Sequence, residues 1–171
     1  MKFSTDIDGV TFLSHDSKLL GGFYRAAGES PRPTALLCHG LPGVEKNLDI
    51  AYALRDASWN CLYFHYRGCW GSAGTYSLNG LIDVARAAAD WLVQQPSVDV
   101  NQLALVGSSI GGYVSLAAGG SDPRFKYLVS ICPFADGQAM PMSIEYSIEW
   151  AGMLNGITSE QLKHEWDHLT P

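Results

Sequence analysis

The chain has 171 residues, of which 47% are apolar and 16% charged, with 17 acidic residues against 11 basic ones. This length suits one domain with a buried core, and the composition is too apolar for a disordered chain. The net charge of −6 and the lack of any Lys/Arg cluster exclude a surface that binds nucleic acid.

The predicted elements begin with a β-hairpin. Residues 10–13 and 19–25 have strand character, and the polar residues 14–17 between them suit a tight turn. Short apolar runs then alternate with segments of helical spacing, in the order strand 34–38, helix 45–58, strand 60–66, helix 80–95, strand 102–106, helix 110–118 and strand 127–132. Such alternation predicts an α/β fold with a mostly parallel sheet that carries helices on both faces.

The pattern changes after Pro133. Two helices, 142–154 and 158–169, follow one another without a strand between them. Thr158 with Gln161 is typical of a capping box at the start of the second helix. We therefore divide the chain into an α/β core, residues 1–137, and a helical cap-like segment, residues 138–171.

The strongest motif is Gly107-Ser108-Ser109-Ile110-Gly111, which lies between a predicted buried strand and a predicted helix. A serine nucleophile on such a sharp turn needs small residues two positions before and two positions after it. Ser109 meets this condition, whereas Ser108 has Val106 and Ile110 at those places. Ser109 is therefore the predicted nucleophile, and the Ile110 backbone N–H at the helix start is a predicted oxyanion donor.

A second motif, His39-Gly40-Leu41-Pro42-Gly43, directly follows the strand at 34–38. Glycines in such a loop let a backbone N–H point at the developing negative charge, and we predict that the N–H of Leu41 is the second oxyanion donor. His39 suggests a catalytic base at first sight. We favour an anchoring role for it, because the histidine follows the serine in the chain order typical of this motif.

A third loop, residues 65–72, contains Arg67 and Trp70 between glycines. Arg67 is predicted to tie loops together through their carbonyl groups, with a substrate-carboxylate clamp as the alternative. Trp70 either lines an acyl pocket or packs against its neighbours. Both alternatives stay open for the sequence alone.

The remaining signals concern compartment and metal. The N-terminus has no apolar signal core, and no apolar run approaches the roughly 18–20 residues that span a bilayer, so we expect a cytoplasmic protein without membrane contact. The four cysteines, Cys38, Cys61, Cys69 and Cys132, suit small buried hydrophobic residues. Zinc binding by Cys61, His65 and Cys69 is the less favoured interpretation of these cysteines. We expect neither a metal nor an organic cofactor.

The three motifs come in the order and approximate spacing of the α/β-hydrolase superfamily. The chain resembles the N-terminal part of its dienelactone hydrolase-like and prolyl-oligopeptidase-like serine hydrolases, over residues 34–134 above all. The resemblance implies acyl transfer from a small-molecule substrate to Ser109, followed by hydrolysis. It implies an ester rather than an amide or peptide bond.

The pattern lacks a general base and an acid. The resemblance places both after later strands, and the 39 residues that follow Cys132 are too few for two further strand–helix units of about 30 residues each. His164, Asp167 and His168 suit a surface helix face, and Asp136 suits a turn before Gly137. We therefore expect an incomplete chain whose strand 127–132 is an exposed apolar edge, able to form a homodimer.

Two functions follow from this reading. The first is a serine hydrolase of the carboxylesterase type, with its base and acid missing from this chain. The alternative is a non-catalytic relic or fragment that acts as a binding or assembly module. Without base and acid, such a site retains about 10³–10⁴-fold catalysis over water.

Overall fold

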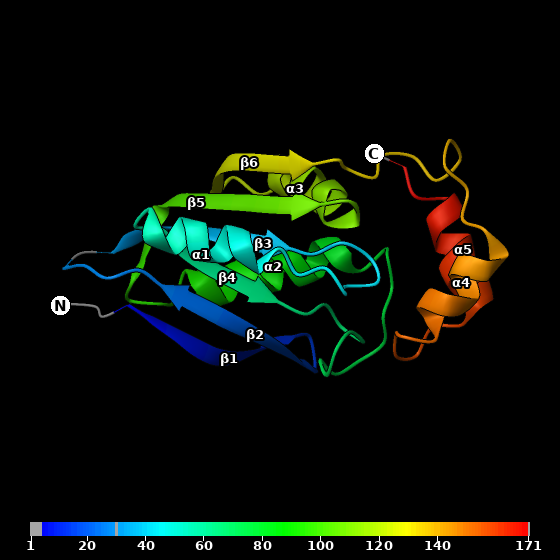
Figure 1. Cartoon of the computed structure of the whole chain (residues 1–171), viewed down its shortest axis with the longest axis horizontal. Coiled ribbons are helices and arrows are strands. Elements are labelled where there is room, and N and C mark those ends of the chain that lie inside the picture. Colours follow the sequence, from blue (N-terminus) through cyan, green and yellow to red (C-terminus); the bar gives the residue numbers. More distant parts are fainter. Residues whose placement is uncertain (1–4, 30, 171) are drawn as a thin grey trace.

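The computed structural model describes residues 5–29 and 31–170. It contains a six-stranded sheet with the strand order β1-β2-β4-β3-β5-β6 (Figure 1). The strands are β1 (Asp6–Ser14), β2 (Ser17–Arg25), β3 (Arg32–Cys38), β4 (Asn60–Phe64), β5 (Val98–Ser108) and β6 (Phe125–Ile131). The hairpin β1–β2 joins β4 in antiparallel fashion, and β4, β3, β5 and β6 pair in parallel. The predicted α/β fold with a mostly parallel sheet is therefore confirmed.

Helices cover both faces of this sheet, as predicted. The helices of the core are α1 (Leu48–Asp56), α2 (Leu81–Leu92) and α3 (Ile110–Ser121). Side chains of β3 alternate between the faces, so that Leu36 packs in the cluster with α2 and α3, and Leu37 packs in the cluster with α1. Because successive side chains of a strand point to opposite faces, one continuous apolar run serves both clusters.

The helical segment lies beyond the carboxyl ends of the parallel strands (Figure 1). It consists of α4 (Ile144–Ala151) and α5 (Ser159–Asp167), which pack against each other. The predicted capping box is present: the Thr158 side chain accepts from the Gln161 backbone N–H, and the Gln161 side chain accepts from the Thr158 N–H. Two residues fasten the segment to the loop before α2. The Asn155 N–H donates to Gly68 O, and the Leu78 N–H donates to the Glu165 carboxylate at 2.6 Å.

Several predicted boundaries were wrong for local reasons. The helix predicted at 45–58 begins at Leu48, because Asn47 has a left-handed backbone with φ of 50°. The helix predicted at 142–154 begins at Ile144, because Ser143 caps it and accepts from the Tyr146 N–H. The strand predicted at 102–106 is longer and begins at Val98, which pairs with Arg32 on the far side of a register shift in β3.

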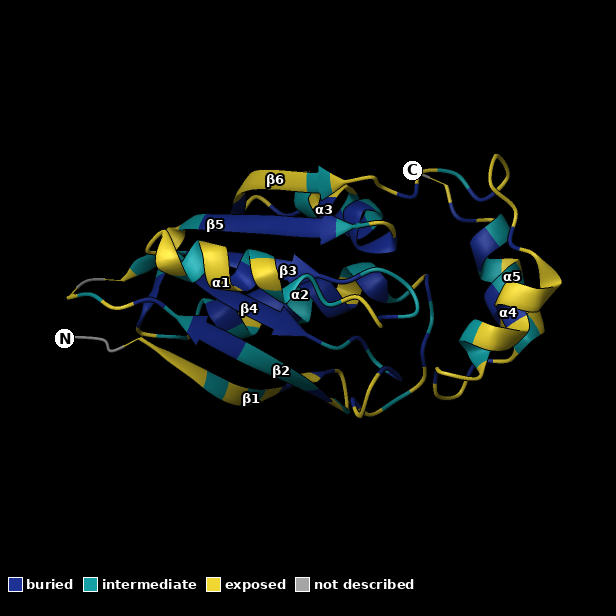
Figure 2. Cartoon of the chain, viewed as in Figure 1, coloured by how far each residue is buried: buried dark blue, intermediate teal, exposed yellow. Residues whose placement is uncertain are grey.

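Strand β6 lies at the edge of the sheet, and Figure 2 shows it largely exposed. Its apolar residues Tyr127, Leu128, Val129 and Ile131 are between 40% and 49% exposed. Among the described strands it pairs with β5 alone. The expectation of an exposed apolar edge near 127–132 is thus confirmed. In the described part of the chain, no helix is long and apolar enough to cross a bilayer.

Candidate active site

Ser109 occupies the sharp turn between β5 and α3. Its backbone has φ 54° and ψ −122°, a conformation that non-glycine residues rarely adopt. The turn is held on both sides, because the Ser109 N–H donates to Ile131 O at 3.0 Å and Ser109 O accepts from the Phe134 N–H at 3.0 Å. The Ser109 residue is exposed and its hydroxyl lines a pocket, so the strained turn presents a reactive group to a space that a ligand can enter.

The flanking glycines are required by close backbone approach. A Cβ at Gly107 would overlap the carbonyl oxygen of Gly111, and a Cβ at Gly111 would overlap the carbonyl oxygens of Cys38 and His39. The Gly-x-Ser-x-Gly spacing therefore packs the start of α3 against the end of β3. This contact is the physical reason for the pattern seen in the sequence.

The loop of residues 39–43, here called the oxyanion loop after its predicted role, lies against Ser109. A Cβ built on Gly40 would be 3.3 Å from Ser109 Cβ and 3.8 Å from Ser109 Oγ. Ile110 is the first residue of α3, so its N–H belongs to the positively polarised end of the helix. The structure thus brings Ser109 together with the loop that contains Leu41 and with Ile110.

Three side chains hold the neighbourhood of the oxyanion loop. The Tyr66 hydroxyl donates to His39 O at 3.0 Å, and Trp70 Nε1 donates to Pro42 O at 2.8 Å. Asn47 Nδ2 donates to the hydroxyl of Ser108 at 2.8 Å. Trp70 is therefore a support of the oxyanion loop and is not among the residues that line the Ser109 pocket. Arg67 contacts the Gly80 carbonyl at 3.4 Å, in keeping with the predicted loop-tying role.

His39, the first residue of this loop, is fully buried. Its Nδ1 lies 2.7 Å from Gly40 O, so Nδ1 carries the proton, and its ring packs 4.2 Å from the Tyr66 ring. Burial lowers the pKa of His39 from 6.5 to about 4, an effect that His65 and Lys46 add to electrostatically. The neutral ring is thus part of the support of the loop, as the anchoring interpretation expects.

The other residues considered from the sequence are engaged elsewhere. His168 Nδ1 bonds the carbonyl oxygen of His164 on an exposed part of α5, and Asp167 pairs with Lys163 at 2.6 Å. Asp136 accepts from the Gln138 N–H at 2.8 Å, which is the predicted turn role. Among the described residues, no three or more His, Cys, Asp or Glu side chains are grouped so that they could hold a metal ion, and Cys61, His65 and Cys69 therefore form no such group.

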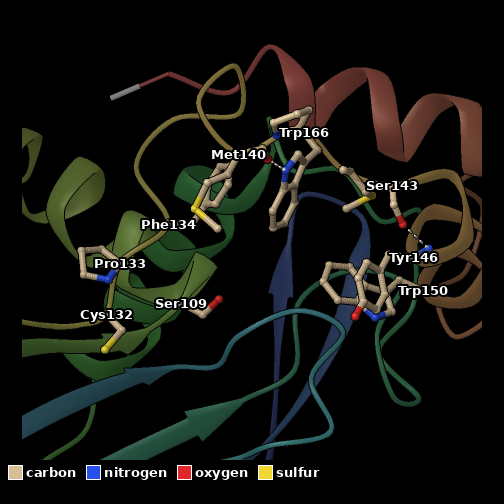
Figure 3. A pocket seen from close by; sticks show the side chains of 11 residues that line it. Ser109, Cys132, Pro133, Phe134, Met140, Ser143, Tyr146, Trp150 and Trp166 are labelled. Carbon is tan, nitrogen blue, oxygen red and sulfur yellow. Dashed lines mark hydrogen bonds between the residues drawn. The ribbon is translucent and has the colours of Figure 1, made fainter.

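The pocket beside Ser109 brings together residues that the sequence analysis did not single out (Figure 3). Its volume is about 450 Å³, and one wall comes from the residues directly after β6 while the other comes from the helical segment. The lining residues are Ser109, Cys132, Pro133, Phe134, Met140, Pro141, Met142, Ser143, Tyr146, Trp150 and Trp166. One sequence signal could have identified part of this wall. Tyr146 and Trp150 are one helical turn apart in the helical segment, so they lie on the same face of their helix.

Comparison with known proteins agrees with this geometry. The sequence model of the prolyl oligopeptidase family matches residues 56–171. The quorum-quenching protein AidA of Acinetobacter baumannii is 31% identical over 143 residues, which cover 79% of this chain and 46% of AidA. The protein YfhR of Salmonella typhimurium is 32% identical over 120 residues, which cover 67% of this chain and 41% of YfhR. The chain thus spans less than half the length of these curated relatives.

Solved structures give the same result. The α/β serine hydrolase XC6422 of Xanthomonas campestris, which has no lid, is 30% identical to this chain, with a TM-score of 0.58. The match covers 70% of this chain and 58% of XC6422. The 2,6-dihydroxy-pseudo-oxynicotine hydrolase matches with a TM-score of 0.76, and the match covers 96% of this chain and 49% of that hydrolase. Its sequence is 15% identical, so this likeness supports the fold alone. The chain therefore belongs to the prolyl oligopeptidase family of the α/β-hydrolase superfamily.

Proposed function

We propose that this chain carries the nucleophile and oxyanion donors of a serine hydrolase that cleaves a carboxylic ester. The observation that carries the proposal is the strained backbone of Ser109, which exposes a hydroxyl at a pocket beside the start of α3. Strain of 1–3 kcal/mol at a single residue is characteristic of functional sites. Family membership and the likeness to the α/β serine hydrolase XC6422 support hydrolysis at a serine, and the choice of an ester bond is part of the proposal.

In the proposed reaction, Ser109 Oγ attacks the ester carbonyl carbon and loses its proton to a base. The backbone N–H groups of Leu41 and Ile110 donate to the oxyanion of the tetrahedral intermediate. The C–O bond to the alcohol then breaks, and the alcohol leaves with the proton from the base. Water attacks the acyl-enzyme in the same way, which releases the acid and restores Ser109.

Among the described residues, neither a hydrogen bond nor the pocket lining places a base or an acid at Ser109. Within residues 5–29 and 31–170, no histidine or carboxylate makes a hydrogen bond with the Ser109 hydroxyl, and none lines its pocket. We propose that the 171 residues by themselves lack a working base and acid. This observation also favours the second candidate function, a non-catalytic binding or assembly module.

A fluorophosphonate probe separates the two candidates. We expect slow but measurable labelling of the 171-residue chain, because the oxyanion donors alone retain part of the catalytic power. Ser109→Ala should abolish the labelling, and Ser108→Ala should retain it, because Ser108 directs its hydroxyl to Asn47. Labelling is read by intact-protein mass spectrometry. A folded chain that takes up no label, or one that Ser109→Ala still labels, would contradict the hydrolase.

We also propose that the β6 edge pairs with a second copy of this chain. Exposed strand edges with apolar side chains pair readily with other strands, and a lysine on the edge prevents such pairing. Val129→Lys is therefore expected to convert a concentration-dependent dimer into a monomer in sedimentation experiments. Val100→Lys is the matched control, because Val100 is also 46% exposed but lies on β5. A wild-type chain that is monomeric at every concentration tested would contradict this assembly.

A further inference from the structure

No charged side chain of the described residues lines the pocket beside Ser109. Apart from the hydroxyls of Ser109, Ser143 and Tyr146, its lining consists of aromatic rings, prolines and sulfur-containing residues. The volume of about 450 Å³ is within the range of small-molecule sites, which are mostly apolar with a few placed polar groups. A ligand group in this space would contact apolar surface on several sides and would meet no counter-charge.

One wall is a continuous series of aromatic rings. The distance between ring centroids is 4.1 Å from Phe134 to Trp166, 5.8 Å from Trp166 to Trp150, and 5.4 Å from Trp150 to Tyr146. The series begins at the nucleophile, because the backbone N–H of Phe134 donates to Ser109 O. It ends at the surface, where Tyr146 is 55% exposed. Aromatic surface therefore lines the pocket from Phe134, next to the Ser109 turn, to the exposed Tyr146 (Figure 3).

Another part of the wall is the stretch Met140-Pro141-Met142, here called the strap. Helix α5 holds its backbone: Trp166 Nε1 donates to Met140 O at 2.7 Å, and Lys163 Nζ donates to Met142 O at 2.7 Å. The Met142 N–H in turn donates to the Asp167 carboxylate at 2.9 Å. Lys163 and Asp167 also form an ion pair with each other. Both charged groups behind the strap are therefore engaged with its backbone and with one another. The strap is thus fixed in place as an apolar surface.

We infer that the substrate is a neutral ester whose carbonyl carbon bears an uncharged apolar group, bound between the aromatic wall and the strap. The inference rests on the proposed function. Each methylene group moved from water into this pocket should tighten binding about fourfold until the pocket is filled. A charge at the far end of the same group should weaken binding, because a buried charge without a partner is strongly disfavoured. Peptides with charged side chains next to the scissile bond fit this pocket poorly.

Binding can be measured without any turnover. The probes are methyl n-alkyl ketones of increasing chain length and the same ketones with a carboxylate at the far end. Their affinity for the 171-residue chain is read from tryptophan fluorescence, since Trp150 and Trp166 line the pocket. We expect the dissociation constant to fall about fourfold per methylene and then level off, with the carboxylate series at least tenfold weaker. Affinity independent of chain length, or equal for both series, would overturn the inference.

Three variants localise the effect. Trp150→Ala should abolish most of the dependence on chain length, while Ile148→Ala, an exposed neighbour on α4 outside the pocket lining, should keep it. If Trp150→Ala fails to fold, Met140→Lys serves instead, because Met140 lines the pocket and is also largely exposed. Met140→Lys should raise the affinity for the carboxylate series severalfold; an unchanged preference would count against the pocket. Fluorophosphonate labelling tests Ser109 separately, so failure of the pocket inference and failure of the proposed function give different results.

Discussion

Replacement of Gly111 by alanine is expected to lower the free energy of unfolding by about 3 kcal/mol. The new Cβ would overlap the carbonyl oxygens of Cys38 and His39. Both are backbone atoms, one in the last residue of β3 and one in the first residue of the oxyanion loop, so neither can turn aside as a flexible side chain would. The turn must open, or the oxyanion loop must move away from Ser109, and either change disturbs packing between α3 and the sheet.

Gly120→Ala is the matched control for this prediction. Gly120 belongs to the same helix, and a Cβ built on it meets nothing within 4 Å. Alanine is the better helix former by about 0.5–1 kcal/mol, so this variant should be as stable as the unchanged chain or slightly more stable. Urea unfolding of the two variants gives the comparison. Equal stability of Gly111→Ala and Gly120→Ala would show that the close approach of α3 to β3 is not required.

The sharp turn at Ser109 could be predicted because its geometry is local. The strained turn needs glycine at positions 107 and 111, and those requirements appear in the sequence as a fixed spacing between a buried strand and a helix. The parallel sheet was equally accessible, because strands buried on both faces leave continuous apolar runs such as residues 34–38. Local rules therefore predicted the core and the place of Ser109.

The pocket could not be predicted in the same way, because its parts meet only after the helical segment has folded back. Phe134 and Trp166 are 32 positions apart in the chain and their rings lie 4.1 Å from each other. The contacts that place the segment, such as Glu165 with Ser77 and Leu78, join residues with no spacing pattern between them. The sequence shows that this segment is rich in aromatic residues and methionines. It does not show which of them meet in the folded chain, because long-range packing decides that.

His39 is expected to make the stability of the chain strongly dependent on pH. Burial lowers the pKa of His39 to about 4, whereas an unfolded chain titrates its histidines near 6.5. Between these two values the unfolded state binds more protons than the folded state, so stability falls as the pH is lowered. Stabilisation by the neutral ring is fully present above pH 6.5 and is lost as the pH falls to about 4. Each unit of pKa shift corresponds to about 1.4 kcal/mol, which gives a loss of about 3 kcal/mol.

His39→Gln tests this prediction, measured as the difference in unfolding free energy between pH 7 and pH 4.5. The variant should be less stable at pH 7 but should lose clearly less stability on acidification than the unchanged chain. His65, whose pKa burial also lowers to about 4, contributes in the same direction and leaves a residual dependence. The control is His164→Gln, because His164 is an exposed histidine on α5 and lies outside the oxyanion loop. An undiminished pH dependence in His39→Gln would mean that other groups dominate acid unfolding. A reduced pH dependence would mean that His39 supports the oxyanion loop only while its ring is neutral. Labelling of Ser109 by the fluorophosphonate should then fall over the same pH range.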